Sequence, residues 1–392
     1  MARNPSSIIN FEGFSSDRAE WKRFARILFL SLVIPWIFLL LLGQWIAIQV
    51  GANLSPEDAA RLQTDHPNLI WYSHRSSDFG RFKLARVAIE RPEILIMGQS
   101  RPQTFRSAMF RPYSAYNLGS ISYTMGSFLD LLHQLPEGYN PKVIIMGCDF
   151  YLFNPASTER NIREHMLQDF SPWHPDYLGT LRDVLTLIPS HPNLLLATLP
   201  QSKDRQLMGL GAYTIHMGFR KDGSTQWYRE SGEDNPRMAE MNSFKDLIQG
   251  DAMGQVEIAQ FEQFVREAHD RGITVVCVQL PMYDRAVEMM KNEKSANLGL
   301  LRDYQNRIAN GYFDRLGVLA FDYLSFPGYS DNYHYFLDAI HPKEGITLAV
   351  LNDMCSDPRF LKILPKLDVE ALKQKLNEDR SGPHFNIYGE EF

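Results

Sequence analysis

A serine and a later Asp-x-x-His pair are the residues of this chain that could do chemistry. Ser100 lies three residues after the apolar run Ile94–Met97, in the segment Gly-Gln-Ser-Arg-Pro, and Asp338 and His341 lie three residues apart near the far end. A serine hydroxyl is a weak nucleophile until a neighbouring base removes its proton, and a carboxylate behind an imidazole fixes the tautomer of that base. The three residues together predict a Ser–His–Asp triad, with Ser100 as nucleophile and His341 as base.

The elements that must position these residues are short strands alternating with helices. Five apolar runs bounded by Gly, Pro, Asn or Asp predict strands at 93–97, 115–118, 142–146, 273–279 and 318–321. Helical patterns lie at 126–135, 256–268, 300–316 and 343–354. This alternation predicts an α/β fold, a three-layer α/β/α sandwich around a central parallel sheet. Ser100 then follows the first strand and Asp338 and His341 follow the last.

The segment 27–50 predicts a transmembrane helix. Its 24 residues carry no charge, and at about 1.5 Å per residue they can cross a hydrocarbon core of roughly 30 Å. A buried core helix would show a polar face. A cleaved signal peptide is disfavoured because the preceding segment is long, the apolar run exceeds a normal signal core and no clear A-x-A site follows.

The charges that flank this segment predict its orientation. Five basic residues precede it, namely Arg3, Arg18, Lys22, Arg23 and Arg26. The first basic residue after it is Arg61. The positive-inside rule therefore places the N-terminus in the cytoplasm and the rest of the chain outside the inner membrane, in the periplasm or the extracellular space.

The chain divides into five expected parts. They are a cytoplasmic N-terminus (1–26), a transmembrane anchor (27–50), a polar juxtamembrane connector with some helix (51–90), the α/β domain (91–364) and a C-terminal tail (365–392). The alternation is interrupted at about 155–254, which contains a helical piece at 177–187 and a turn at 221–224. We interpret this stretch as an insertion or cap over the carboxyl end of the sheet, where ligands bind in open α/β folds.

The composition limits the classes of partner. A formal charge of −6 without a basic stripe argues against nucleic acid. The three cysteines, Cys148, Cys277 and Cys355, predict no disulfide framework. No metal-ligand spacing occurs, so neither a metal nor another cofactor is expected.

Four blocks of sequence resemble the SGNH (GDSL-like) hydrolases. These are Ile96 to Arg101 around the nucleophile, Tyr116 to Ser122, Val143 to Asp149 and Leu337 to Pro342, of which the last is the most specific. The chain is similar to the membrane-anchored branch of that family, which includes the D-alanyl transfer protein of teichoic acid modification and the alginate O-acetylation proteins. Pro102 stands where the second glycine of a G-x-S-x-G elbow would be, so a standard α/β-hydrolase fits less well.

The resemblance implies an oxyanion hole, with two departures from the family pattern. Its backbone donors would come from Ser100 and the second block, where Ser122 occupies the position of the family's glycine and Gly119 lies three residues earlier. The third block normally supplies an asparagine, and this chain has Cys148 and Asp149 there. An ionised Asp149 would repel an oxyanion, so it could help only if protonated or by holding another donor in place.

Residues in or next to these blocks are further candidates for substrate binding. They are Arg101, Asn117 and Tyr151. Arg101 could bind an anionic or sugar group, or it could be an ordinary surface arginine. Tyr151 could stack on a sugar, although packing in the core is the more common role for such a residue.

These features together predict an extracytoplasmic serine O-acyltransferase or esterase. It would move an acetyl or similar group to or from a cell-surface or periplasmic glycan through an acyl-serine. The resemblance implies a multi-spanning membrane-bound O-acyltransferase as partner, because one helix cannot carry an acyl donor across a bilayer. Two alternatives stay open: a catalytically degenerate domain that binds glycan or assembles the complex, and a peripheral lipid esterase.

Overall fold

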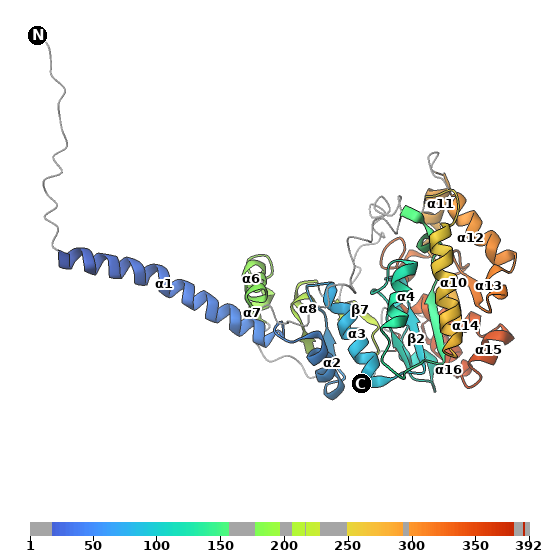
Figure 1. The fold of residues 1–392 in the computed structure, drawn as a ribbon, viewed down its shortest axis with the longest axis horizontal. Helices are drawn as coiled ribbons and strands as arrows, with labels where there is room; N and C mark the ends of the chain where they lie inside the picture. The colour runs from blue at the N-terminus through green and yellow to red at the C-terminus, as the bar shows by residue number, and fades with distance from the viewer. Residues whose placement is uncertain are drawn as a thin grey trace, which may run out of the picture.

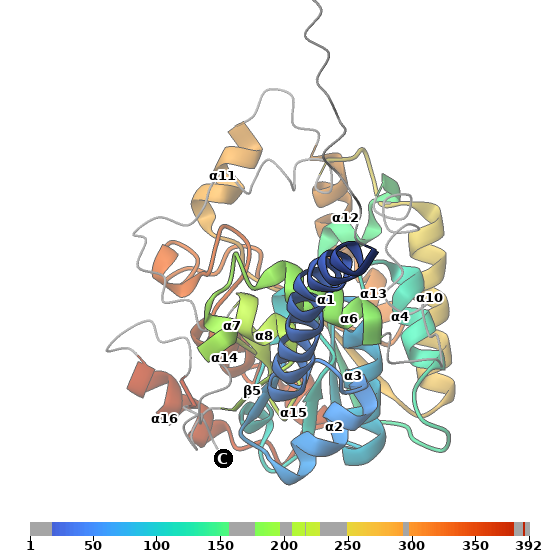
Figure 2. The same ribbon diagram turned by 90° about the vertical axis from the view of Figure 1, so that its left-hand side faces the viewer.

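The structure, a computed structural model, describes residues 18–156, 177–196, 206–215, 217–227, 249–292, 298–379 and 387–388. A long N-terminal helix projects from an α/β body (Figure 1), and helices α6 (Tyr177–Leu187), α7 (Asn193–Leu196) and α8 (Leu210–Ile215) lie where this helix meets the body (Figure 2).

Helix α1 (Arg18–Gln49) contains the predicted transmembrane segment except for its last residue, Val50. Its stretch Trp21–Gln49 is long and apolar enough to cross a membrane. The large side chains from Trp21 to Leu41 are exposed, whereas Ile46 and Ala47 are fully buried against the body. Pro35 lies inside the helix without ending it. The helix itself is confirmed.

The body is built on a parallel sheet of five strands in the order β3-β2-β4-β8-β9. The strands are β2 (Ile94–Met97), β3 (Ala115–Asn117), β4 (Val143–Gly147), β8 (Thr274–Gln279) and β9 (Leu319–Asp322). Each coincides with one of the five predicted strands to within one residue at either end. Aliphatic runs of this length form strands that are buried on both faces.

Alternate side chains of the sheet enter two separate cores. Leu95 and Met146 belong to the first core and Ile94 and Ile145 to the second. The first core includes residues of α4 (Met125–His133), α10 (Gln255–Asp270), α12 (Gly299–Ala309) and α13 (Tyr312–Arg315). The second includes residues of α14 (Glu344–Met354), α15 (Pro358–Ile363) and α16 (Val369–Asp379). Because helices cover both faces, the fold is α/β and compatible with a three-layer α/β/α sandwich.

The predicted helix at 300–316 is two helices, α12 and α13. Gly311 lies between them with a φ of 67°, in the left-handed region that a glycine adopts without strain. The break turns α13 so that Tyr312 and Phe313 enter the first core.

A second, smaller sheet was not predicted. Its order is β5-β1-β6-β7, with β1 (Leu69–Trp71), β5 (Gln206–Met208), β6 (Met217–Phe219) and β7 (Thr225–Trp227). Strand β1 belongs to the segment expected to be a connector, and the other three belong to the expected insertion. The segment 51–90 is therefore no spacer: it forms α2 (Pro56–Asp65), β1 and α3 (Ser77–Glu90), with Trp71 and Phe82 stacked in the core.

The β6–β7 hairpin of the insertion lies beside the edge strand β3. The hairpin of β6 and β7 turns at the predicted residues 221–224, where Asp222 accepts a backbone hydrogen bond from Asn117 N at 2.8 Å. Gly223 has a φ of +76°, and a Cβ there would lie 2.3 Å from the carbonyl oxygen of Asn117. The part of the chain that the structure describes leaves out residues 157–176, 197–205, 216 and 228–248 of the insertion.

Candidate active site

Ser100 lies at the carboxyl end of β2, in a turn made possible by two glycines. A Cβ at Gly98 would come within 2.2 Å of the Pro102 ring, and a Cβ at Gly147 on the neighbouring strand β4 within 2.9 Å. Pro102 thus fills the space next to both strand ends. The chain after Ser100 forms a single 3₁₀ turn, η1 (Arg101–Thr104). This turn leaves Ser100 partly exposed.

The structure brings Ser100, His341 and Asp338 together although the serine is 241 positions from the histidine. Ser100 Oγ is 2.6 Å from His341 Nε2, and His341 Nδ1 is 2.6 Å from Asp338 Oδ2. The side chains of His341 and Asp338 are 15% and 18% exposed. A hydroxyl, the far nitrogen of an imidazole and a carboxylate behind its near nitrogen are in the order that proton transfer from the serine requires.

Asp338 is held in place by its own loop. Its Oδ1 accepts the backbone N–H groups of Ile340 at 2.8 Å and of His341 at 2.9 Å, so only Oδ2 faces the imidazole. Burial by itself would raise the pKa of Asp338, but the attraction of His341 and these hydrogen bonds outweigh it and lower the pKa to about 2. The carboxylate is therefore ionised at every pH at which an imidazole could act as base.

Gly119 and Ser122, the oxyanion-hole candidates from the second sequence block, differ in their hydrogen bonding. Gly119 donates its N–H to Asn117 Oδ1 at 2.8 Å, and its carbonyl accepts a hydrogen bond from the buried Lys83 at 2.6 Å. Its N–H is thus already engaged within the loop, contrary to expectation. Ser122 is fully buried, and within the described structure its hydroxyl has no hydrogen-bond partner. The backbone N–H groups of Ser100 and Ser122 stay predictions.

Arg101 is the main correction to the expected site, because it is fully buried and its three guanidinium nitrogens bind protein groups. Nη1 pairs with Asp149, and Nη2 donates to the carbonyls of Leu280 at 2.5 Å and Pro281 at 2.6 Å. Nε donates to the carbonyl of Ile340 at 3.0 Å. The side chain next to the nucleophile therefore holds the histidine loop, and it does not face a substrate.

Asp149, in the block where the family pattern has an asparagine, is bound entirely by protein groups. It is fully buried, with Oδ1 accepting from Gln279 Nε2 at 3.1 Å and Oδ2 from the Tyr151 hydroxyl at 2.9 Å, in addition to Arg101. Burial raises the pKa of Asp149, and the positive charge of Arg101 opposes this. Since the pair with Arg101 neutralises it, Asp149 acts as an anchor for a cation and the expected repulsion of an oxyanion is reduced.

The other expected ligand contacts are also internal. Tyr151 is 3% exposed, and its hydroxyl donates a hydrogen bond to Asp149. Asn117 is 1% exposed, and its Nδ2 donates to the carbonyls of Pro102 at 2.8 Å and Phe105 at 2.9 Å. Cys148 is fully buried in the first core. These residues shape the loops around Ser100 from within.

The sequence analysis did not predict the side chains that connect the loops at the carboxyl ends of β2, β4 and β8. Gln279, the last residue of β8, contacts Asp149, and its Oε1 accepts the N–H of Phe150 at 2.8 Å. A signal was present, because Arg101 and Asp149 are opposite charges placed just past the ends of two apolar runs. Strands β2 and β4 are neighbours, and such charges meet at one edge of a parallel sheet.

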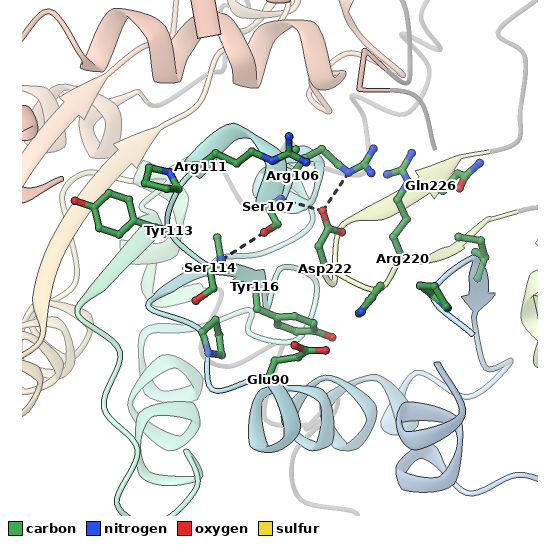
Figure 3. A pocket seen from close by; sticks show the side chains of 17 residues that line it. Glu90, Arg106, Ser107, Arg111, Tyr113, Ser114, Tyr116, Arg220, Asp222 and Gln226 are labelled. Atoms are coloured by element: carbon green, nitrogen blue, oxygen red, sulfur yellow. Dashed lines mark hydrogen bonds and ion pairs between the residues drawn. The ribbon is translucent and has the colours of Figure 1, made fainter. Parts of the chain in front are cut away.

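A separate cavity of about 390 Å³ lies on the β3 side of the body, and the triad residues do not line it (Figure 3). Most of its charge is compensated by protein groups. Arg106 contacts Asp222 at 3.1 Å and Glu344 at 3.1 Å, and Arg220 contacts Glu344 at 3.2 Å. This network connects the β6–β7 hairpin to the first turn of α14, three residues after His341.

The comparisons with known proteins leave the site to be judged on its geometry. The sequence matches no protein-family model, and no curated protein is significantly similar to it. Within the described ranges, no group of three or more His, Cys, Asp and Glu side chains is arranged to hold a metal ion.

Proposed function

We propose that the chain is a membrane-anchored serine O-acyltransferase or esterase that works on the extracytoplasmic side of the inner membrane. The observation that carries the proposal is the pair of 2.6 Å contacts that join Ser100 Oγ, the His341 ring and Asp338 Oδ2. The resemblance of the four sequence blocks to SGNH hydrolases supports the same reaction class. The proposed substrates are an acyl ester, acetyl or similar, and a hydroxyl of a cell-envelope glycan.

The proposed reaction has two steps. His341 Nε2 takes the proton of Ser100 as Oγ attacks the acyl carbonyl, and the imidazolium then protonates the leaving oxygen, which leaves an acyl-serine. An acceptor hydroxyl next gives its proton to His341 and attacks the acyl carbonyl, so that a new ester forms and the proton returns to Ser100. Water in place of the acceptor gives hydrolysis, so transferase and esterase share one site.

The proposed location rests on α1 and its flanking charges. Lys22, Arg23 and Arg26 precede the apolar run, and the positive-inside rule favours an N-terminus in the cytoplasm with the α/β body facing outward. An acyl donor made in the cytoplasm must then cross the bilayer by another route. We propose a multi-spanning membrane O-acyltransferase as the partner that delivers it.

A serine-directed probe tests the proposal without knowledge of the natural substrate. The full chain in detergent is treated with a fluorophosphonate, which reacts with activated serines, and is assayed with 4-methylumbelliferyl acetate. We expect labelling at Ser100 and ester hydrolysis, both lost in Ser100→Ala. The exposed Ser356 provides the matched control, and Ser356→Ala should keep both signals.

The outcomes separate the alternatives. Hydrolysis and labelling that persist unchanged in Ser100→Ala would contradict the triad. A folded wild-type protein that shows neither signal would favour the non-catalytic glycan-binding or assembly subunit. A strong preference for long-chain over acetyl esters would favour the lipid esterase.

A further inference from the structure

The outer end of helix α1 is packed into the body. Ile46, Ala47 and Val50 are fully buried in a small apolar cluster with Val184 of α6 and Leu194 of α7. Gly43 gives the closest approach, since a Cβ there would lie 2.7 Å from Leu181 Cδ1. In both views α6 and α7 lie beside this end of α1 (Figures 1 and 2).

Hydrogen bonds also tie this junction together. Val50, the first residue after α1, accepts a backbone hydrogen bond from Gly209 N at 2.6 Å, which ties it to the segment after β5. Asp183 of α6 is bound by His74 Nε2 at 2.8 Å, on the segment that follows β1. Because α1, α6 and the small sheet are joined at these points, no free linker separates the anchor from the body.

The length of α1 places this junction at the membrane surface. If Lys22, Arg23 and Arg26 mark the inner boundary, a hydrocarbon core of about 30 Å takes up about 20 residues and ends near Ile46. Gly43 would then lie about 5 Å inside the outer boundary and Val50 about 6 Å beyond it. Helix α6, which packs along this stretch, must lie at the same depth.

The exposed side chains of this region fit a lipid interface. Trp45 and Ile48 on α1 are 48% and 57% exposed, and Leu195 on α7 is 42% exposed. Tryptophan is enriched at the headgroup level, and interfacial helices bury their apolar face about 5–10 Å deep at the boundary of headgroups and acyl chains.

We propose that Gly43–Val50, α6 and α7 form an interfacial collar, seated among the phospholipid headgroups and upper acyl chains of the outer surface of the bilayer that α1 crosses. The collar holds the body directly against the membrane, where an acyl donor that emerges from a membrane partner would appear. The proposal depends on α1 spanning the bilayer as in the proposed function, and it does not depend on the triad chemistry.

Nitroxide labels can measure the depth of the collar in the full chain. The protein is reconstituted into vesicles of phosphatidylethanolamine and phosphatidylglycerol, with a label at Ile48→Cys, Leu195→Cys or the control Val256→Cys. Val256 lies on α10 and is 59% exposed. The three native cysteines are buried. Collisions with oxygen, which concentrates in lipid, are compared with collisions with a water-soluble nickel chelate.

We expect the oxygen-to-nickel ratio at residues 48 and 195 to be several-fold higher than at residue 256. A lipid-like ratio at 48 with a water-like ratio at 195 would overturn the collar and leave the anchor intact. Water-like ratios at both would overturn the spanning role of α1 as well. A label at 195 that is immobile and shielded from both reagents would show a protein neighbour and overturn the lipid assignment.

A second variant tests whether packing on α1 sets the depth of α7. Gly43→Leu forces α6 away because of the contact with Leu181, so the label at residue 195 should become more accessible to nickel. Ser31→Leu, on an exposed part of α1, is the matched control and should leave the label unchanged. Equal accessibility in the two variants would contradict the collar.

Discussion

Replacing Asp338 by asparagine should stop the reaction with little change in structure. Asp338 Oδ1 accepts two backbone N–H groups at 2.8 and 2.9 Å, and an asparagine can keep both only by placing its oxygen there. Its NH₂ group then takes the place of Oδ2, 2.6 Å from His341 Nδ1. Because that group donates, Nδ1 must accept, and the ring proton moves to Nε2.

This tautomer cannot take the proton of Ser100. The nitrogen 2.6 Å from Ser100 Oγ would carry a hydrogen and no free lone pair. In a triad, the wrong tautomer lowers the rate by a factor of about 10⁴, which corresponds to about 5 kcal/mol of transition-state stabilisation. We therefore expect Asp338→Asn to lose nearly all activity towards 4-methylumbelliferyl acetate and nearly all fluorophosphonate labelling.

The assay compares initial rates and melting temperatures. The exposed Asp331, in the loop that leads to the triad, is the control, and Asp331→Asn should keep the wild-type rate. Nitrogen NMR of labelled histidine would report the shift of the ring proton directly. An Asp338→Asn protein that retains more than about a tenth of the wild-type rate would refute this role of the carboxylate, since the expected loss is about a thousand times larger.

Two further predictions concern stability. Arg101→Met leaves the buried Asp149 without its counter-charge, so the free energy of unfolding should fall by about 3–5 kcal/mol; Arg359→Met, with 63% of its side chain exposed, should change it by less than about 1 kcal/mol in the same urea titration. An equal loss of unfolding free energy in the two variants would show that the buried Arg101–Asp149 pair contributes no more to stability than an exposed arginine. Asp338 has a pKa of about 2 in the folded protein, below the ordinary 3.8. The ionised carboxylate therefore contributes fully to the stability of the fold above the unfolded pKa, and this contribution is lost as the pH falls towards the folded pKa. Between pH 5 and pH 3 we expect a loss of about 1 kcal/mol that Asp338→Asn lacks, and an identical pH dependence of the two proteins would contradict the low pKa.

The sequence by itself determined the local elements of the fold. All five strands of the parallel sheet were predictable, because a short aliphatic run between turn residues has few alternatives to a buried strand. The helix of residues 18–49 and its apolar run were predictable for a similar reason. The meeting of Ser100, His341 and Asp338 could be predicted from their positions after the first and last strands, since parallel strands bring their carboxyl ends to one edge of the sheet.

Only the tertiary structure decided what the polar residues around the triad do. Arg101 could have faced solvent or substrate by its sequence position, but it is enclosed by Asp149 and three carbonyls from segments up to 239 residues away. The small sheet could not be predicted from the sequence, because β1 has only three residues and pairs with β5 and β6, more than 130 positions later. Such contacts leave no local periodicity. They depend on which distant segments fold side by side, and this is settled by packing of the whole chain.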